Sequence, residues 1–436
     1  MLDRRILDVT GVGIGPSNLS LAALLYPVDG ASSCFLERKK CFEWHPGLLF
    51  PEANIQVSFL KDLVTLVDPR SAFSFISFLH AQKRLYRFII ANFPRISRLE
   101  YNQYLQWICA SLPDLHFGCE VEEITHDGNS FVIYGNGKPR YARNLVLGTG
   151  LSPSVPSCAK KYLAEPSVFF ALEFLDHEID ATGLRVAVIG GGQTGAEIVS
   201  RLLLDTGRLP KGVIWVSRRY NFLPLDESPF ANELFTPAYS EYYYKLSRGE
   251  KSRLLLEQKL ASDGVAADLL ERIYRQLYNL EFLHQRGRIC SLRPDCRISE
   301  IEKVGGEWLL TINSSRADPM EVIPADIIIL CTGFEYRMPT FLSGLRDRIS
   351  WTEDGYKVAR DFSIEWDGPG DQKIYVQNAA HKQRGVADPN LSLIAWRSAT
   401  IVNSVMKRTV YDVGRTSSLF DWEQEQRAGV SVEGLL

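Results

Sequence analysis

Residues 6–18 of the chain read ILDVTGVGIGPSN, and this stretch decides the fold. Residues 6–12 are an apolar run that ends in glycines, which predicts a buried strand followed by a tight turn. Residues 20–26 then predict a helix, and residues 33–36 predict a second strand. Together they form a β-α-β unit, the building block of a doubly wound α/β sheet.

The turn after this first strand has the features of a dinucleotide-binding site. Glycines let the backbone turn tightly and approach a pyrophosphate, and the helix that follows directs its N-terminal amides at the phosphates. An acid that ends the second strand is expected to bind the ribose. The predicted cofactor residues here are Gly11, Gly13, Gly15, Pro16, Asn18 and Glu37. A plain turn is the alternative for the glycines alone, but the flanking strand, helix and acid favour the dinucleotide site.

A second β-α-β unit is predicted from a strand at residues 185–189, a helix at 194–204 and a strand at 213–216. Its turn is a complete G-x-G-x-x-G motif, and the predicted cofactor residues are Gly190, Gly192, Gln193, Thr194 and Gly195. Where a site for NAD carries an acid, this chain carries Arg218 and Arg219. Cations there suit the 2′-phosphate of NADP, although a solvated strand end is the alternative. The two turns therefore predict FAD at the first site and NADPH at the second.

Two further strands, predicted at residues 144–147 and 326–330, also run into glycine turns followed by prolines, which indicates crossings between domains. Residues 240–283 are rich in Leu, Glu, Lys, Arg and Tyr, a composition that predicts mostly helix. The predicted fold class is α/β, with two doubly wound, Rossmann-like nucleotide-binding domains and a small helical substrate domain. The predicted ranges are 1–180 and 334–436 for a discontinuous FAD domain, 181–225 and 284–333 for the NADPH domain, and 226–283 for the substrate segment.

Composition and charge exclude several classes of function. The formal net charge of the 436 residues is −3, so no basic field favours nucleic acid or an anionic membrane. The apolar stretch at residues 6–14 is interrupted by glycines and has no small-residue cleavage site, so no signal peptide is expected. No apolar run approaches the ~18 residues that span a bilayer. The cytoplasm is the expected location.

The cysteines are scattered, and none form a C-x-x-C or C-x-x-x-x-C pair. Their positions are Cys34, Cys41, Cys109, Cys119, Cys158, Cys290, Cys296 and Cys331. This spacing argues against a zinc knuckle, so no metal site is predicted, and it argues against the redox disulfide of a flavin disulfide reductase. A plain hydride carrier would need only the two cofactors, whereas a monooxygenase also needs a site closed to water. Composition does not choose between these two.

A longer and more specific block follows the second strand. Residues 42–47 read FEWHPG, residues 54–65 read NIQVSFLKDLVT, and Asp68-Pro69 follows. This block resembles the N-hydroxylating flavin monooxygenases. These are the lysine N6-hydroxylases and ornithine N5-hydroxylases of hydroxamate siderophore synthesis, with their diamine-hydroxylating relatives. The resemblance continues in FSF at 73–75, DESPFANELFTP at 226–237 and LSL at 391–393, and it covers nearly the whole chain.

The resemblance implies an FAD domain, an NADPH domain inserted into it and a small helical substrate domain. It also implies the reaction: NADPH reduces the flavin, oxygen gives a C4a-hydroperoxyflavin, and a neutral amine attacks the distal oxygen. The expected partners are therefore a small-molecule amine and O2, without nucleic acid, and the expected assembly is a homo-oligomer, a dimer or a tetramer. Because the amine is the nucleophile, positioning and water exclusion matter more than a side-chain base.

The resemblance also implies roles for single residues. Lys61 and Asn232 match positions that contact the amino-acid end of the substrate, and Gln56 matches a position beside the flavin ring. Ser392 lies in the block that matches the flavin-proximal loop, so Gln56 and Ser392 are the catalytic candidates. The remaining predicted cofactor residues are Trp44, His45, Gln56, Thr332, Gly333, Leu391 and Ser392.

Structural alternatives to these roles stay open. Lys61 could form a salt bridge with Asp62 or Asp68, and Asn232 could cap a turn after a proline. His45 could make a structural hydrogen bond, and no chemistry is assigned to it.

The departures from the family pattern indicate a branch. Residues 261–265, ASDGV, stand where ornithine hydroxylases have a Thr-Asn-Tyr-Ser run, and they resemble the lysine and diamine branch. Cys331 and Phe334 replace Ala and Tyr in the Ala-Thr-Gly-Tyr turn, and Arg384 stands where histidine is expected. The leading hypothesis is L-lysine N6-hydroxylation towards a hydroxamate siderophore. The alternatives are a cadaverine or putrescine hydroxylase, a flavin-dependent NADPH oxidoreductase without oxygen insertion, and a nucleotide-bound regulatory protein.

Overall fold

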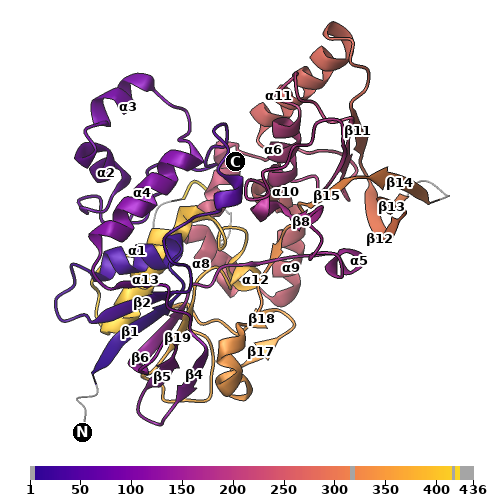
Figure 1. Ribbon diagram of the computed structural model, residues 1–436. Coiled ribbons are helices and arrows are strands. Elements are labelled where there is room, and N and C mark those ends of the chain that lie inside the picture. Colours follow the sequence, from indigo (N-terminus) through magenta and orange to yellow (C-terminus); the bar gives the residue numbers. More distant parts are fainter. Residues whose placement is uncertain (1–4, 315–319, 415–417, 423–436) are drawn as a thin grey trace, which may run out of the picture.

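The computed structural model describes residues 5–314, 320–414 and 418–422 (Figure 1). These residues form two lobes, each built on its own sheet. In Figure 1 the first sheet lies at the lower left and the second at the upper right. This arrangement is the α/β fold with two Rossmann-like domains that the two glycine turns predict.

The first lobe contains a seven-stranded sheet in the order β3-β2-β1-β6-β5-β4, and β19 also pairs with β6. β1, β2, β3, β6 and β19 are parallel, whereas β5 is antiparallel to both of its neighbours. The strands are β1 (Ile6–Val12), β2 (Ser33–Glu37), β3 (Leu115–Phe117), β4 (Glu123–His126), β5 (Phe131–Tyr134), β6 (Arg140–Leu147) and β19 (Ile374–Val376). Because β19 pairs with β6, the chain returns to the first sheet after it has built the second.

The first lobe also carries helices. They are α1 (Pro16–Leu25), α2 (Phe75–Ala81), α3 (Leu85–Ala91), α4 (Arg98–Ser111), α12 (His381–Arg384) and α13 (Ile394–Met406). α1 packs against α13, and every residue of α1 after Pro16 is buried. α1 begins four residues before the predicted helix, because Pro16 occupies its first turn, where a missing N–H costs nothing.

The second lobe contains a five-stranded parallel sheet in the order β11-β10-β9-β15-β8, with helix α6 (Gln193–Leu202) after β9. Its strands are β8 (Val168–Phe170), β9 (Arg185–Ile189), β10 (Gly212–Val216), β11 (Cys290–Arg293) and β15 (Ile327–Leu330). An antiparallel sheet of β12 (Cys296–Val304), β13 (Glu307–Ser314) and β14 (Glu321–Ala325) extends from this lobe. β8 falls inside the range predicted for the FAD domain but pairs with β15 in the second sheet.

Residues 226–283 are mostly helical, and the two lobes share them. The helices are α7 (Pro229–Asn232), α8 (Pro237–Lys245), α9 (Arg248–Glu257), α10 (Lys259–Asp263) and α11 (Ala267–Tyr278), and a π-helical turn, η4 (Asn279–Leu283), continues α11. Phe235 and Ala261 belong to the apolar core around α1 and α13. Leu269 and Ile273 of α11 belong to the core of the second sheet, because α11 packs on α6. The segment that was predicted to bind the substrate therefore bridges the lobes.

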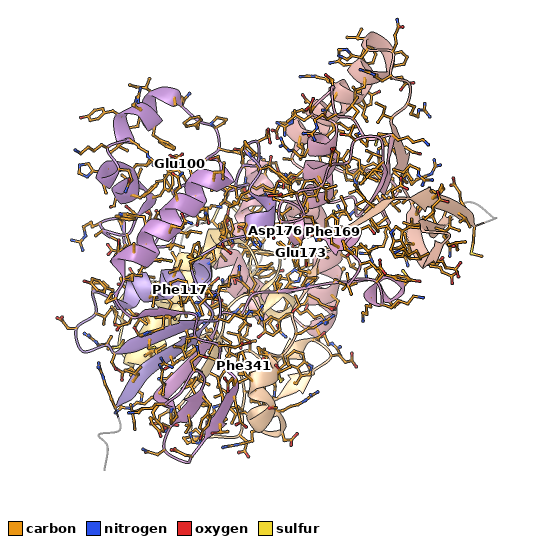
Figure 2. All side chains as sticks on the ribbon, viewed as in Figure 1. Glu100, Phe117, Phe169, Glu173, Asp176 and Phe341 are labelled. Carbon is orange, nitrogen blue, oxygen red and sulfur yellow. The ribbon has the colours of Figure 1, made fainter. Side chains whose placement is uncertain are left out.

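The chain crosses between the lobes at a short antiparallel pair, β7 (Ser152–Pro153) with β16 (Phe334–Glu335). β8 and the 3-10 turn η2 (Ala171–Glu173) lie where the lobes meet, and Phe169, Glu173 and Asp176 mark this stretch in Figure 2. The remaining elements are η1 (Pro46–Leu48), α5 (Ser157–Lys160), η3 (Glu233–Phe235), η5 (Thr340–Arg348), β17 (Trp351–Thr352), β18 (Gly355–Tyr356) and η6 (Leu391–Leu393). Within the described ranges, no helix is long and apolar enough to cross a bilayer.

Candidate active site

The first glycine turn joins β1 to α1 and has one packed side and one open side. Gly13 has a φ of 90°, and a Cβ built on it would lie 2.4 Å from the carbonyl oxygen of Gly148. A Cβ built on Gly11 would collide with the ring of Phe35. At Gly15, the residue that caps α1, a Cβ would meet no atom within 4 Å. The turn is thus fixed by β6 on one side and leaves the N-terminal amides of α1 open on the other.

Two of the residues predicted to bind the first cofactor contact the turn itself. The Asn18 side chain is buried, and its Nδ2 donates to the carbonyl oxygen of Gly13 at 2.8 Å. The Glu37 carboxylate, at the end of β2, accepts from the backbone N–H of Ile14 at 2.9 Å. Both side chains therefore hold the shape of the turn, and Asn18 faces inward rather than towards the open side.

The second glycine turn, between β9 and α6, repeats this arrangement. A Cβ on Gly190 would lie 2.0 Å from the carbonyl oxygen of Cys331, and one on Gly195 would lie 2.0 Å from the carbonyl oxygen of Gly190. A Cβ on Gly192 would meet no atom within 4 Å. Thr194 lies in the first turn of α6, so its backbone N–H is one of those that the helix leaves unpaired.

The side chain of Gln193, one of the predicted cofactor residues, is held by the protein itself. Its Nε2 donates to Glu197 at 2.9 Å, and its Oε1 accepts from the backbone N–H of Ala266 at 2.8 Å. Both ends of the amide are occupied by the protein, because α11 begins at this point against α6. What Gln193 can offer a phosphate is its backbone N–H at the start of the helix.

Arg218 and Arg219 follow β10, and their side chains differ. The Arg219 guanidinium donates to the carbonyl oxygen of Asp263 at 2.8 Å and lies 3.9 Å from the Asp263 carboxylate. Arg218 is exposed, and within the described part of the chain it has no hydrogen bond or ion pair. Arg218 is therefore the cation that is free to meet a 2′-phosphate.

Thr332 and Gly333 lie at the crossing between the lobes. The Thr332 hydroxyl donates to the carbonyl oxygen of Ser154 at 2.7 Å, and Gly333 has a φ of 85°. The Thr332 side chain thus fastens the two crossing segments, while a Cβ on Gly333 would meet nothing within 4 Å.

Lys61 and Ser392, which are far apart in the sequence, meet in the structure. The Lys61 ammonium donates to the Ser392 hydroxyl over 3.2 Å. Ser392 is buried in η6, where its backbone N–H donates to the side chain of Asn390 at 2.8 Å, and Leu391 precedes it in the same turn. Partial burial lowers the pKa of Lys61. The contact brings one predicted substrate residue to one predicted catalytic residue.

The structure does not contain the salt bridge that was the alternative for Lys61. The Asp62 carboxylate accepts from the backbone N–H groups of Val64, Thr65 and Phe75 and from the Thr65 hydroxyl, so it faces its own loop. Among the residues that the structure describes, no carboxylate pairs with Lys61. An ammonium group without a carboxylate partner can pair with an anionic group of a ligand.

Gln56 lies in the same block, and its side-chain nitrogen is buried without a hydrogen-bond partner. A buried amide N–H without an acceptor costs about 1–3 kcal/mol, so such a group indicates a missing partner. Gln56 can therefore donate to an acceptor atom of a bound ring system.

Trp44 and His45 form the turn before η1. His45 is in the left-handed region with a φ of 51°, and its ring lies against that of Trp44. His45 is exposed as a whole residue, but protein atoms lie close enough around its ring to disfavour the charged imidazolium. This crowding, with the charges of Arg98 and Lys39, lowers its pKa to about 4. The ring is therefore neutral at pH 7.

Asn232 ends α7 and is exposed. Its Nδ2 donates to the carbonyl oxygen of Glu227 at 3.2 Å, which is the local capping contact that was the alternative to substrate binding. No hydrogen bond within the described ranges joins Asn232 to Lys61 or Ser392. Its Oδ1 has no partner there and stays available to a ligand.

A buried polar network that the sequence motifs do not indicate connects the first glycine turn with α13. Arg397 is 1% exposed and pairs with Asp388 at 3.1 Å. Its Nε donates to Gln377 at 2.9 Å, and Gln377 donates to the carbonyl oxygen of Ser17 at 3.0 Å. The network fixes the segment that carries Ser392 to the first turn of α1.

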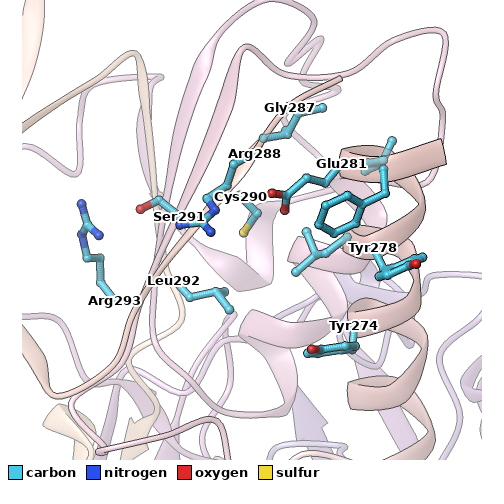
Figure 3. A pocket seen from close by; sticks show the side chains of 13 residues that line it. Tyr274, Tyr278, Glu281, Gly287, Arg288, Cys290, Ser291, Leu292 and Arg293 are labelled. Carbon is cyan, nitrogen blue, oxygen red and sulfur yellow. The ribbon is translucent and has the colours of Figure 1, made fainter. Parts of the chain in front are cut away.

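A cavity of about 360 Å³, drawn in Figure 3, lies elsewhere. It opens between the end of α11 and the edge strand β11, and Tyr274, Tyr278, Glu281 and Arg288 are among its lining residues. It contains none of the predicted site residues, so it is not the predicted active site.

The residues present fit two dinucleotides. Each glycine turn has an open position at the N-terminus of a ten-residue helix, where backbone amides and the helix dipole favour a pyrophosphate. The Gln56 amide, which lacks a hydrogen-bond partner, lies in the lobe that contains the first turn. Arg218, which lacks an ion-pair partner, lies in the lobe that contains the second turn.

Comparison with known proteins shows the family of this chain. Residues 5–336 match the family described as L-lysine 6-monooxygenase/L-ornithine 5-monooxygenase. The chain is 37% identical to an L-lysine N6-monooxygenase of Escherichia coli, over 96% of this chain and 99% of that one.

Solved structures match along most of the chain as well. An FAD-bound cadaverine monooxygenase of the desferrioxamine pathway from Erwinia amylovora has a TM-score of 0.89 and 30% identity, covering 96% of this chain and 98% of that one. An ornithine N-hydroxylase from Kutzneria sp. 744 with reduced FAD, NADP+ and L-ornithine has a TM-score of 0.86 and 31% identity, covering 92% and 99%. The chain therefore belongs to the L-lysine 6-monooxygenase/L-ornithine 5-monooxygenase family and is a flavin-dependent N-hydroxylating monooxygenase.

Proposed function

We propose that this enzyme hydroxylates the terminal amine of L-lysine, as an early step towards a hydroxamate siderophore. The observation that carries the proposal is the environment of Lys61. Its ammonium group is partly buried, has no carboxylate partner among the described residues and lies 3.2 Å from the Ser392 hydroxyl. An amino acid brings the missing carboxylate, whereas a diamine does not.

The enzyme uses FAD and NADPH. The first glycine turn, with Gly15 at its open side, would hold the FAD pyrophosphate, and Gln56 would donate to an acceptor of the flavin ring. The second turn would hold the NADPH pyrophosphate at Gly192, and Arg218 would pair with the 2′-phosphate. When bound, the reduced flavin supplies activated oxygen to the amine.

The residues of the chain position the substrate and remove water. Lys61 would pair with the substrate carboxylate, and the Ser392 hydroxyl, which accepts from Lys61, would hold the ammonium group in place. Asn232 would bind the amino-acid end through its free Oδ1. The terminal amine must lose its proton before it can act as a nucleophile. A site closed to water would favour the neutral form of that amine, because removal from water disfavours the charged ammonium.

A diamine hydroxylase is the second candidate. It is favoured by the structural match to the cadaverine monooxygenase and by 33% identity to a putrescine N-hydroxylase of Shewanella oneidensis, over 94% of this chain and 83% of that one. The two candidates differ in one respect: a lysine hydroxylase must bind the substrate carboxylate, and a diamine hydroxylase has none to bind.

The proposal is tested by assaying L-lysine, L-ornithine, cadaverine and putrescine separately with the FAD-loaded enzyme and NADPH. Hydroxylamine product is quantified against NADPH consumed. The proposal expects the highest kcat/KM and the tightest coupling with lysine. A higher kcat/KM for cadaverine or putrescine would assign the chain to the diamine branch instead.

Two further proposals concern the cell. We propose a cytoplasmic location, where the eight cysteines, all free in the structure, would remain reduced. We also propose a homo-oligomer, a dimer or a tetramer, which light scattering of the purified protein tests directly.

A further inference from the structure

Arg98 and Glu197 form a buried ion pair at the junction between the lobes. Arg98 is the first residue of α4, on the FAD side, and Glu197 lies in α6, on the NADPH side. The pair is bidentate: Nη2 lies 2.9 Å from Oε1, and Nη1 lies 3.2 Å from Oε2. The side chains are only 14% and 7% exposed. A bidentate pair fixes direction as well as distance, because the guanidinium and the carboxylate must be coplanar.

On the FAD side, Arg98 is bound to the block that carries Gln56. Its backbone N–H donates to the carbonyl oxygen of Ala53 at 2.8 Å, and its Nη1 donates to that of Leu48 at 3.0 Å. Ile55, the residue before Gln56, donates to the carbonyl oxygen of Ile96 at 3.0 Å. Arg98 is therefore joined by hydrogen bonds to the segment that carries the unpartnered amide of Gln56.

On the NADPH side, Glu197 is bound to the second glycine turn. Its Oε1 also accepts from Gln193, which follows the open Gly192. The other end of the Gln193 amide accepts from Ala266, where α11 begins. Glu197 is thus the point where the FAD lobe, the NADPH turn and the helical substrate segment are joined by hydrogen bonds.

We propose that Arg98 and Glu197 are positioning residues for flavin reduction: their ion pair sets the distance and angle between the flavin edge and the nicotinamide. Flavin reduction moves a hydride from NADPH to FAD, so one cofactor loses the two electrons that the other gains. Such a transfer depends steeply on the approach of the two rings. Among the described residues, neither side chain forms a hydrogen bond with the open positions Gly15 and Gly192, so we expect the pair to act more on the relative placement of the two turns than on cofactor affinity.

The interface supplies a matched control. Arg201 of α6 and Glu52 also lie across the junction, but they are 3.9 Å apart and their side chains are 43% and 41% exposed. A solvated pair of this kind contributes little to stability and does not fix the orientation of one lobe relative to the other. Arg201→Met therefore removes a positive charge at the same junction, from the helix that carries Glu197, without removing the bidentate contact.

The test compares Arg98→Met, Glu197→Gln and Arg201→Met with the wild type by anaerobic stopped flow. We expect the limiting rate of flavin reduction to fall at least tenfold in Arg98→Met and several-fold in Glu197→Gln. The FAD content and the NADPH concentration for half-maximal rate should change less than twofold. The reversed pair, Arg98→Glu with Glu197→Arg, should recover part of the rate.

Hydrogen exchange of the cofactor-free proteins gives a second readout. We expect faster exchange at η1 and η2 in Arg98→Met, with β1 and β9 unchanged. A limiting reduction rate within twofold of the wild type in both single variants would overturn the proposal. An equal loss in Arg201→Met, or a loss explained entirely by a raised NADPH requirement, would also overturn it. If Arg98→Met does not fold, the same criteria apply to Glu197→Gln, which keeps the size of the side chain.

Discussion

Replacing Lys61 by methionine separates an amino-acid substrate from a diamine. Methionine keeps most of the length of the side chain and removes the charge, so the apolar contacts of the stem are retained. Loss of the charged partner of a buried carboxylate costs about 2–5 kcal/mol. Lys61 is only partly buried, and water can enter when the ammonium group is gone. The low end is therefore expected, about 2 kcal/mol, or about 30-fold in the apparent KM for lysine.

The assay is a cycle of two enzymes and two substrates. The wild type and Lys61→Met are each measured with L-lysine and with cadaverine, which differ by the carboxyl group. For cadaverine we expect a change below about threefold, the size of an exposed ion contact. The rate of flavin reduction by NADPH should be nearly the same in Lys61→Met as in the wild type, with either substrate. An exposed lysine at some distance, Lys138→Met, controls for the loss of a positive charge.

Two results would refute this reasoning. An unchanged KM for lysine, with lysine shown to be the best substrate, would remove the carboxylate assignment. Loss of FAD from Lys61→Met would mean that Lys61 and Ser392 support the cofactor and that the substrate site lies elsewhere.

The remaining predictions concern the cofactors, the substrate segment and acid stability. Arg218→Ala should lower the preference for NADPH over NADH by about 1.5–3 kcal/mol, and Arg219→Ala by less, because Arg219 is held by Asp263; equal use of both nucleotides by the wild type would contradict this. Gly13→Val should purify without yellow FAD, because the added Cβ meets the Gly148 backbone at 2.4 Å; a fully yellow variant would show that the first turn was misassigned. Asn232→Ala should raise the KM for the amine while flavin reduction is retained, and an unchanged KM would leave only the capping role. His45, whose pKa is lowered to about 4, stays neutral in the folded state, whereas the unfolded state gains a proton below pH ~6.5. The folded state therefore loses stability as the pH falls from ~6.5 to ~4, and His45→Gln should show a smaller fall in Tm over that range; an identical fall would exclude this group.

The elements that sequence patterns predict best are those with local causes. β1 and β9 have the predicted bounds, because each is an apolar run that a glycine turn ends. The predicted start of α1 was wrong by four residues. A helix that is buried on all sides has no apolar stripe that marks its ends, so Pro16 alone signals its first turn. The division of residues 226–283 between two cores depends on which surfaces meet over long sequence distances, and no local pattern contains that information.

The same division holds for the site. Both glycine turns follow from local spacing, and the structure adds which positions are open, Gly15 and Gly192. The meeting of Lys61 with Ser392 is a contact over 331 residues, and only the resemblance to the family placed both in one site. The Arg98–Glu197 pair gave no signal, because an arginine at a helix start and a glutamate within a helix are common surface features. Burial between two lobes makes them a fixed contact, and burial is a property of the assembled fold.

The measurement that tests the central claim most directly is a competition among substrates. The FAD-loaded enzyme is given NADPH, oxygen and an equimolar mixture of L-lysine, L-ornithine, cadaverine and putrescine, each below its KM. The hydroxylated products are then separated by chromatography and quantified by mass spectrometry. Product ratios then report the ratios of kcat/KM. The account predicts that N6-hydroxylysine is the main product and that its share falls when Lys61 is replaced by methionine. A mixture dominated by N-hydroxycadaverine or N-hydroxyputrescine, with the same ratios in Lys61→Met, would contradict it.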